Sequence, residues 1–303
     1  MVPVGRESGA AARVQQRAET LAASLPPLLA AAERVAATVV QGVHGRRRVG
    51  LGETFWQFRP YEPGDRPQLI DWRQTAKGDR VFVRDLEWEA AQSVWLWRDG
   101  SGSMSWRSVE ARDSKQQRAE LLLLALAALL LRGGERVAAL GSGAVPGGGR
   151  PALLRMALSL EREMAKTANL PPQEILPRYG RLVLFSDFLA PLEEIAGLVR
   201  QHASRGIRGH LIQILDPAEL SFPYAGRLLV EGLEGEGSWL ISRSESVRGA
   251  YLKRLERQRL GLAELARRFS WTYSMHRTDR SPEGALLQLY QLIAELRGVG
   301  GRR

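Results

Sequence analysis

The sequence predicts an α/β fold in which a mostly parallel β-sheet is covered by helices on both faces. Segments with strand character and segments with helix character alternate from residue 91 onward. Two of the strand segments, residues 181–186 (RLVLFS) and 210–215 (HLIQIL), are apolar at most positions, as is typical of strands that are buried on both faces. Together these two observations indicate a doubly wound sheet.

The order of the elements follows from hydrophobic periodicity and from turn residues. A long helix is expected over Ser114–Arg132, because an apolar run fills its second half and Gly133-Gly134 follows it. Strands are expected at Gln92–Arg98, Arg136–Leu140, Arg181–Ser186, His210–Leu215 and Ser270–Met275. Two short strands are expected at Arg227–Glu231 and Ser238–Ser242. Further helices are expected at Ala152–Ala165, Pro191–Arg205, Ser246–Phe269 and Glu283–Leu296.

We expect four parts along the chain. Residues 1–41 are rich in Ala, Leu and Glu and predict two helices that meet at Pro26-Pro27. Residues 42–90 are dense in Gly, Pro, Arg and aromatic residues, with short strands at Thr54–Arg59 and Arg80–Leu86. The sheet domain takes residues 91–297, with a β-hairpin insertion near 222–242, and residues 298–303 are expected to form a frayed tail.

Composition limits the classes of function. The 303 residues carry 43 basic and 33 acidic side chains, for a formal net charge of +10. All but four of the basic residues are arginine, and they are spread over the whole chain, so the charge does not indicate nucleic-acid binding. Cysteine is absent, which excludes disulfides and thiolate metal sites. The histidines His44, His202, His210 and His276 show no metal-ligand spacing.

No membrane span is expected. The most apolar run, Leu121–Leu131, is much shorter than the roughly twenty residues that cross a bilayer. Residues Met1–Arg17 lack the apolar core of a signal peptide. We therefore expect a cytoplasmic protein.

Carboxylates and hydroxyls follow two of the predicted core strands. Asp99-Gly100-Ser101-Gly102-Ser103 (D-x-S-x-S) comes directly after the first strand, and Asp187 comes directly after residues 181–186. Ligands of such sheets bind at the carboxyl ends of the strands. These oxygen donors suit Mg²⁺ or Mn²⁺. In the alternative interpretation, Asp99 and the serines only cap the helix that follows.

This pattern resembles the metal-ion-dependent adhesion site of von Willebrand factor A domains. The resemblance implies that Ser101 and Ser103 bind a divalent cation directly, that Asp99 and Asp187 act through water or from a second layer, and that a carboxylate of a partner protein completes the coordination. The family's site also has a threonine on a further loop.

The upstream segment resembles the bacterial domain-of-unknown-function family 58. The residues that carry the resemblance are Gly52-Glu53-Thr54-Phe55, Arg59-Pro60-Tyr61-Glu62-Pro63-Gly64-Asp65 and Ile70-Asp71-Trp72-Arg73-Gln74-Thr75-Ala76, with Phe222-Pro223-Tyr224 further on. The resemblance implies a von Willebrand factor A-like domain and a functional partnership with MoxR-type AAA+ ATPases, which remodel or activate target proteins.

The chain departs from the family pattern at two positions. Arg150 stands where the adhesion-site threonine is expected, and Thr167 is the nearest threonine. Arg98, directly before Asp99, occupies a strand position that is usually apolar. An arginine beside the site could replace the charge of the cation.

The front segment crowds charged and aromatic residues together. We expect an internal network in which Arg59 binds Asp65 or Asp71, with Tyr61 and Trp72 as packing anchors; a partner-binding surface is the alternative. The adjacent arginines at 46–48 are expected to be exposed.

We expect a non-enzymatic adaptor that binds a MoxR-type AAA+ ATPase and an unknown client protein through a degenerate adhesion site. The alternative is a metal-dependent hydrolase or phosphotransferase that uses Asp99 and Asp187, because two carboxylates on one Mg²⁺ can support phosphoryl chemistry. Against it, the chain has no phosphate-binding G-x-x-x-x-G-K-[ST] motif.

Overall fold

We analysed a computed structural model, which describes residues 29–40, 55–61, 70, 72–77, 80–86, 93–163, 169–178, 180–233, 235 and 237–300. The chain divides into two compact units. The smaller unit lies within residues 46–91, and the larger one contains the remaining described residues.

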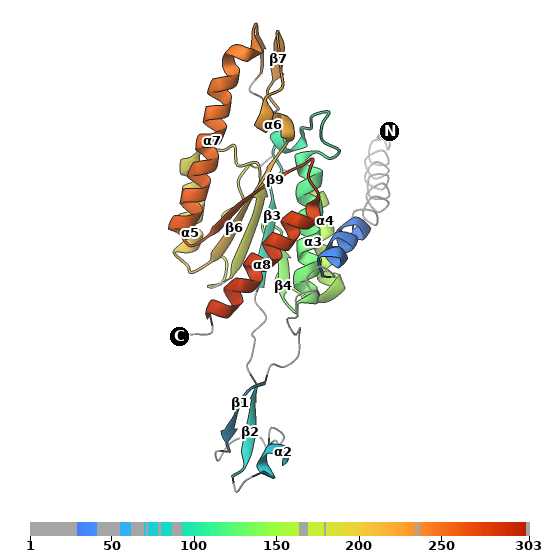
Figure 1. Ribbon diagram of the computed structural model, residues 1–303, viewed down its shortest axis with the longest axis vertical. Helices are drawn as coiled ribbons and strands as arrows, with labels where there is room; N and C mark the ends of the chain where they lie inside the picture. Colours follow the sequence, from blue (N-terminus) through green and yellow to red (C-terminus); the bar gives the residue numbers. More distant parts are fainter. Residues whose placement is uncertain are drawn as a thin grey trace, which may run out of the picture. The chain divides into compact units, whose positions relative to one another are not determined.

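The larger unit is built on a five-stranded sheet in which every strand runs parallel to its neighbours (Figure 1). The strand order is β4-β3-β5-β6-β9, so β3 lies inside the sheet between β4 and β5. The strands are β3 (Ser93–Arg98), β4 (Arg136–Ala139), β5 (Arg181–Ser186), β6 (Arg208–Leu215) and β9 (Thr272–Arg277).

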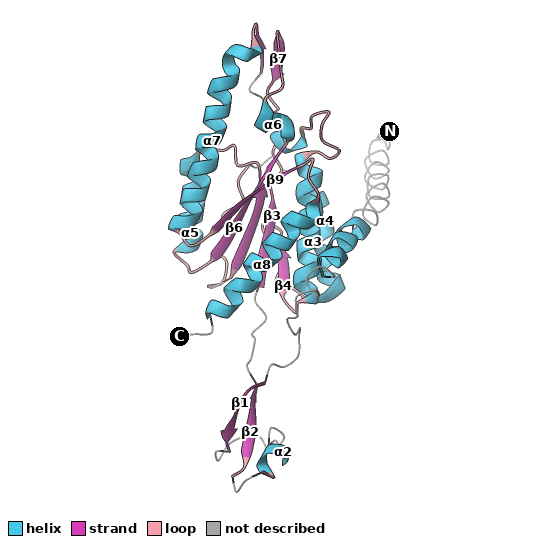
Figure 2. Ribbon diagram, viewed as in Figure 1, coloured by secondary structure: helices cyan, strands magenta, loops and turns pink. Residues whose placement is uncertain are grey.

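Helices cover both faces of this sheet (Figure 2). One face packs on α3 (Lys115–Arg132), α4 (Gly149–Glu163), α8 (Pro282–Gly300) and a helix over residues 29–40. The other packs on α5 (Leu192–Ala203) and α7 (Ser244–Arg268). Side chains that alternate along β3 separate the two cores: Val94 and Leu96 enter the first, Trp95 and Trp97 the second.

The long helix α3 begins at a well-defined cap. The Ser114 hydroxyl accepts from the Gln117 N–H at 3.2 Å, and the Gln117 side chain accepts from the Ser114 N–H at 3.0 Å, which completes a capping box. Leu122–Leu130 of α3 are then buried against the sheet. This burial explains the apolar run in the sequence.

The neighbouring inner strands β3 and β5 lead to opposite faces of the sheet. The chain leaves β3 into α3 on one face and leaves β5 into α5 on the other. The carboxyl ends of β3 and β5 therefore form the topological switch point of a doubly wound sheet, where ligands bind in such folds. This arrangement confirms the predicted fold class, a von Willebrand factor A-like parallel sheet with helices on both faces.

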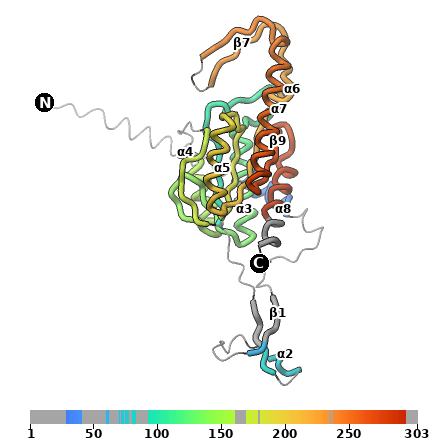
Figure 3. Tube along the Cα trace, turned by 90° about the vertical axis from the view of Figure 1, so that its left-hand side faces the viewer, coloured from blue at the N-terminus to red at the C-terminus, as the bar shows by residue number. Residues whose placement is uncertain are grey.

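An extension beyond the sheet follows β6. The short helix α6 (Pro217–Ser221) leads to a hairpin of two antiparallel strands, β7 (Leu228–Glu231) and β8 (Ser238–Ile241), before α7 begins. The hairpin projects past the carboxyl edge of the sheet next to the first turns of α7 (Figure 3).

In the smaller unit, β1 (Phe55–Pro60) pairs antiparallel with β2 (Phe82–Leu86). A one-turn helix, α2 (Trp72–Thr75), is tied to β2 because the Phe82 N–H donates to Thr75 Oγ1 at 3.0 Å. These strands are the two that the sequence predicted.

Element positions agree with the sequence to within a few residues, with two differences. Helix α8 runs through Gly300, so residues 298–300 are helical where we expected a frayed tail. The short helices α2 and α6 were not predicted. The expected bend at Pro26-Pro27 lies outside the described residues. Within the part of the chain that the structure describes, no helix is long and apolar enough to cross a membrane.

Candidate functional site

The D-x-S-x-S loop begins where β3 ends and is held by the end of β5. Asp99 Oδ1 accepts from the Ser101 N–H at 2.8 Å, and Asp99 Oδ2 accepts from the Ser186 hydroxyl at 2.5 Å. Asp99 and Ser101 are both buried. Asp99 does not cap α3, because Ser114 does. The interpretation in which Asp99 caps the long helix is therefore wrong for α3.

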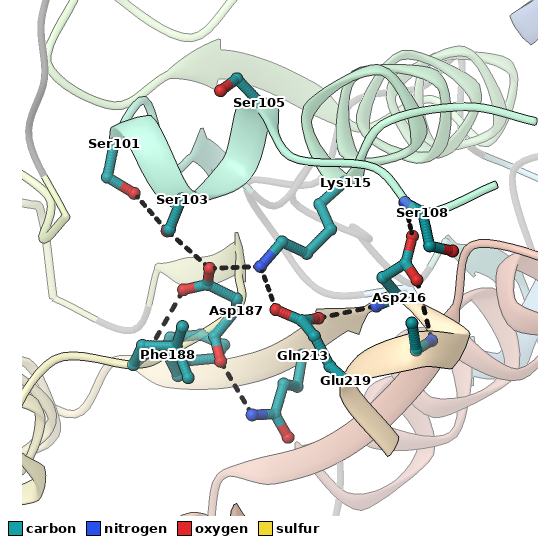
Figure 4. Close-up of polar contacts among 12 residues, drawn as sticks. Ser101, Ser103, Ser105, Ser108, Lys115, Asp187, Phe188, Gln213, Asp216 and Glu219 are labelled. Atoms are coloured by element: carbon teal, nitrogen blue, oxygen red, sulfur yellow. Dashed lines mark hydrogen bonds and ion pairs between the residues drawn. The ribbon is translucent and has the colours of Figure 1, made fainter. Parts of the chain in front are cut away.

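Asp187 meets this loop from the neighbouring strand (Figure 4). The Ser103 hydroxyl donates to Asp187 Oδ2 at 2.6 Å, and the hydroxyls of Ser101 and Ser103 lie 3.1 Å apart. The backbone carbonyl of Asp187 accepts from the Gln213 side-chain amide at 2.8 Å, which ties it to β6. The four residues predicted from the sequence thus gather at the switch point.

A buried lysine joins the group. The Lys115 ammonium lies 2.9 Å from Asp187 Oδ2 and 2.6 Å from Glu219 Oε1, and the Lys115 side chain is only 1% exposed. Lys115 is the first residue of α3, and Glu219 comes from α6. One ammonium therefore links α3, the end of β5 and α6 (Figure 4).

Asp216 fixes the position of Glu219. Glu219 Oε2 accepts from the Asp216 N–H at 2.8 Å, and Asp216 Oδ1 accepts from the Ala218 N–H at 2.9 Å, so the two acids form a capping box on α6. Asp216 Oδ2 also accepts from the Ser108 N–H at 2.9 Å, which anchors the loop before α3.

Burial and neighbouring charges set the electrostatics of the site. Burial, reinforced by the negative charge of Asp187, raises the pKa of Asp99 to about 6. Burial alone would lower the pKa of Lys115, but the carboxylates of Asp187 and Glu219 outweigh it and raise that pKa above its ordinary value. Lys115 is thus a permanent cation.

The side chains that converge here carry a formal charge of −2, from three carboxylates (Asp99, Asp187 and Glu219) and the Lys115 ammonium. That charge matches one divalent cation. Among the described residues, no three His, Cys, Asp or Glu side chains form a metal cluster by themselves. A cation at this place would depend on the Ser101 and Ser103 hydroxyls, which are hard donors suited to Mg²⁺ or Mn²⁺. The donor chemistry therefore fits.

Arg98 does not supply positive charge to the site. Its side chain leaves β3 on the face covered by α3 and α4, where Nη2 donates to the Leu160 carbonyl at 3.1 Å and lies 3.3 Å from Glu120 Oε1. Nη1 donates to the Asp99 carbonyl at 3.2 Å, so Arg98 contacts only the backbone of that residue. The positive charge at the site comes from Lys115, which lies 2.9 Å from Asp187 Oδ2.

Arg150 lies at the other end of the sheet, and its expected place in the site was wrong. Gly147 pairs with Val137 beside the start of the sheet, and Arg150 follows in the first turn of α4. Only the far end of α4, at Leu160, reaches Arg98, and the fifteen-residue helix spans about 20 Å. Thr167, the other candidate for the missing ligand, lies outside the described residues.

The front-segment residues belong to the smaller unit. Trp72 is 68% exposed and Tyr61 is 37% exposed, so neither is the packing anchor that we expected. Arg59 lies in β1, whereas Asp65, Asp71 and the arginines at 46–48 lie outside the described residues. The expected Arg59 network stays a prediction.

The hairpin tip reaches the D-x-S-x-S loop. A Cβ atom placed on Gly102 would lie 2.3 Å from the carbonyl oxygen of Leu233, so only glycine allows this approach. Several apolar side chains near this edge of the sheet are exposed, among them Val109 and Leu189. The edge that carries the site therefore also offers apolar surface.

The fold and the site define a von Willebrand factor A-like domain with a D-x-S-x-S loop at the end of the inner strand β3. The model of the family described as "Protein of unknown function DUF58" matches residues 57–261, and the chain belongs to this family, as the front-segment motifs predicted. Uncharacterized proteins of Mycobacterium tuberculosis and Mycobacterium bovis are each 25% identical to it over 277 residues, which cover 86% of this chain and 86% of the relative.

Two solved structures match part of this chain with low TM-scores. One is an aerotolerance-related membrane protein from Bacteroides fragilis (TM-score 0.38, 16% identity) and the other is the conserved hypothetical protein BatB from Bacteroides thetaiotaomicron (TM-score 0.36, 13% identity). Each match covers 68% of this chain and 100% of the other.

Proposed function

We propose that this protein is a non-enzymatic binding module that works in the cytoplasm with a MoxR-type AAA+ ATPase in the remodelling or activation of client proteins. The observation that carries the proposal is the convergence of Asp99, Ser101, Ser103 and Asp187 at the switch point, with a formal charge of −2 once Lys115 and Glu219 are included. Family membership supports the link to the ATPase.

The serines and the aspartates of the site have different roles in binding. Ser101 and Ser103 present their hydroxyls to a divalent cation, and Asp99 and Asp187 hold the loop and balance the charge. Such a cation supplies a point of attraction for a carboxylate of the partner or client. The exposed Leu189 and Leu233 beside the site add apolar contact area.

Two features favour binding over the hydrolase alternative. The raised pKa of Lys115 keeps its amine protonated, which excludes it as a base. The described histidines His202, His210 and His276 are buried in the domain, with pKa values lowered chiefly by burial.

The test is the affinity for the MoxR-type ATPase of the same organism, measured by biolayer interferometry with Mg²⁺ and with a chelator. We expect the double variant Ser101→Ala, Ser103→Ala, and chelation of the wild type, each to weaken binding about tenfold or more, since charge-assisted contacts would be lost. Ser105→Ala is the matched control, because this exposed hydroxyl in the same loop donates only to the Gly102 carbonyl. Equal affinity of the double variant and the wild type would refute the proposal.

A further inference from the structure

The β7–β8 hairpin has an open edge. Strand β7 pairs with β8 on one side, and within the described residues it makes no backbone pairing on the other. Its base is closed by the Ser244 N–H, which donates to the Gly226 carbonyl at 2.8 Å. An unpaired strand edge is a template for a further strand.

Both faces of the hairpin are apolar and exposed. On β7, Leu229 is 57% exposed, and on β8, Trp239 and Leu240 are 54% and 60% exposed. A two-stranded sheet alone is marginally stable in water, whereas four strands form a stable unit. The hairpin therefore has the properties of a sheet that is completed by a partner.

The sequence of β7 is complementary to itself when it runs antiparallel. Residues 227–231 read Arg-Leu-Leu-Val-Glu. In an antiparallel pair centred on Leu229, Arg227 lies opposite Glu231 of the second copy, Leu228 opposite Val230, and Leu229 opposite itself. Residues 227, 229 and 231 share one face of the strand, so each charged pair flanks the central leucines.

The charges at both ends of β7 are available for this pairing. Arg227 and Glu231 are exposed, and neither makes an ion pair with another described residue. The positive end of one strand meets the negative end of the other, and a two-fold axis makes both contacts at once.

We propose that two copies of this chain associate through the β7 edges of their hairpins and form a continuous four-stranded sheet in the order β8-β7-β7-β8. Charge complementarity favours a second copy of the chain as the partner, because residues 227–231 carry both the positive and the negative member of each ion pair. The association needs neither the cation nor the ATPase and goes beyond the proposed function.

Sedimentation velocity of the full chain over a dilution series tests this proposal. We expect a concentration-dependent dimer in the wild type. Arg227→Glu places Glu opposite Glu, and Glu231→Arg places Arg opposite Arg, so each single variant should dissociate about tenfold more readily. Circular dichroism should show both variants folded, because the two side chains are exposed.

Two further samples, a double variant and a mixture, test whether Arg227 faces Glu231 of the second copy or whether a change in net charge alone weakens the dimer. The double variant Arg227→Glu, Glu231→Arg restores both opposite-charge pairs and should dimerise like the wild type. An equimolar mixture of the two single variants should also dimerise, since each Glu then faces an Arg. A wild type that stays monomeric at every concentration overturns the proposal. A dimer that neither single variant weakens also overturns it, and would indicate pairing through β8 or another surface.

Discussion

The ammonium of Lys115 lies 2.9 Å from Oδ2 of Asp187, with both side chains buried at the carboxyl edge of the sheet. This contact places a permanent positive charge beside the oxygen donors of the D-x-S-x-S loop. The second carboxylate on the same ammonium, Glu219, connects the site to α6, the element that leads into the hairpin. The Lys115 side chain therefore contributes both to the charge balance at the site and to the position of α6, which leads into the β7–β8 hairpin.

Replacing Lys115 with methionine should destabilise the domain strongly. Two buried carboxylates would lose their counter-ion, and breaking a buried pair in this way costs about 3–5 kcal/mol of the free energy of unfolding. Urea unfolding measures the loss. The exposed Lys253 on α7 gives the control Lys253→Met, for which we expect a change within about 0.5 kcal/mol.

A second variant in the urea unfolding experiment tests whether the charge of Lys115 causes the loss of stability. Adding Glu219→Gln to Lys115→Met removes one stranded carboxylate and should recover part of the lost stability, with a coupling free energy of about 1 kcal/mol or more. Strictly additive losses would show that Lys115 acts through packing and not through its charge.

Gly209 should not tolerate a side chain. It lies in β6 against Trp271, and an added Cβ would meet ring atoms at 2.1–2.4 Å. The ring is fixed because Trp271 Nε1 donates to the Ile207 carbonyl at 3.0 Å. We expect Gly209→Ala to lower the melting temperature, with a loss of about 1–3 kcal/mol.

Gly197 in α5 is the matched position for this comparison. An added Cβ there meets no atom within 4 Å, so Gly197→Ala should stabilise the helix by about 0.5–1 kcal/mol. The same sign of change at both positions would contradict the packing described for Trp271.

Stability should fall on acidification because of buried histidines. Burial, with a smaller contribution from Arg181, lowers the pKa of His210 to about 4, against an ordinary value of 6.5. Between these two pH values His210 is therefore protonated in the unfolded chain but neutral in the folded chain. The contribution of His210 is fully present above pH 6.5 and is lost as the pH falls toward 4, by on the order of 3 kcal/mol.

Urea unfolding at a series of pH values measures this loss. His210→Gln keeps a polar group that can pair with Thr272 Oγ1, the present neighbour of Nδ1 at 2.6 Å, but cannot titrate. The variant should lose stability less steeply between pH 6.5 and 4. Equal slopes would mean that the pKa of His210 is the same in the folded and the unfolded chain, against the lowered pKa described here.

Gly102→Ala should loosen the contact between the hairpin and the loop. The added Cβ would lie 2.3 Å from the Leu233 carbonyl oxygen, so the hairpin backbone must move. We expect several-fold faster hydrogen–deuterium exchange in residues 228–241, measured by mass spectrometry. Gly148→Ala, where no atom lies within 4 Å, should leave this exchange unchanged. Equal exchange in both variants would show that the hairpin does not depend on this contact.

The sheet could be predicted from the sequence because its strands are short apolar runs between clear turn residues. Residues 181–186 were predicted with the bounds that the structure gives to β5. The small helix α6 was missed because its five residues are too few to show a helical period. Its start, however, was marked by Asp216, Pro217 and Glu219, which form a capping box with proline at the first position.

Only part of the candidate site could be predicted from the sequence. Asp99, Ser101, Ser103 and Asp187 follow their strands directly, so sequence order places them together. Lys115 and Glu219 come from helices far along the chain, and only the folded topology brings them to Asp187. One signal was available, because lysine is rare in this arginine-rich chain and Lys115 stands at the start of the predicted long helix.

Arg150 shows why loop assignments failed. Arg150 was expected beside the site, but the glycines before it, Gly147–Gly149, run back along β4 and take the start of α4 away from the site. Nothing in a glycine-rich segment indicates the direction of the backbone, since glycine favours no single conformation.

The most direct test of the proposed site is calorimetric titration of Mg²⁺ into the metal-stripped protein and its variants. The account predicts one cation per chain for the wild type and for the control Ser105→Ala, and no measurable binding for Asp99→Ala. Identical titration curves for the wild type and Asp99→Ala would contradict the claim that the carboxyl edge of this sheet is a cation-assisted binding site.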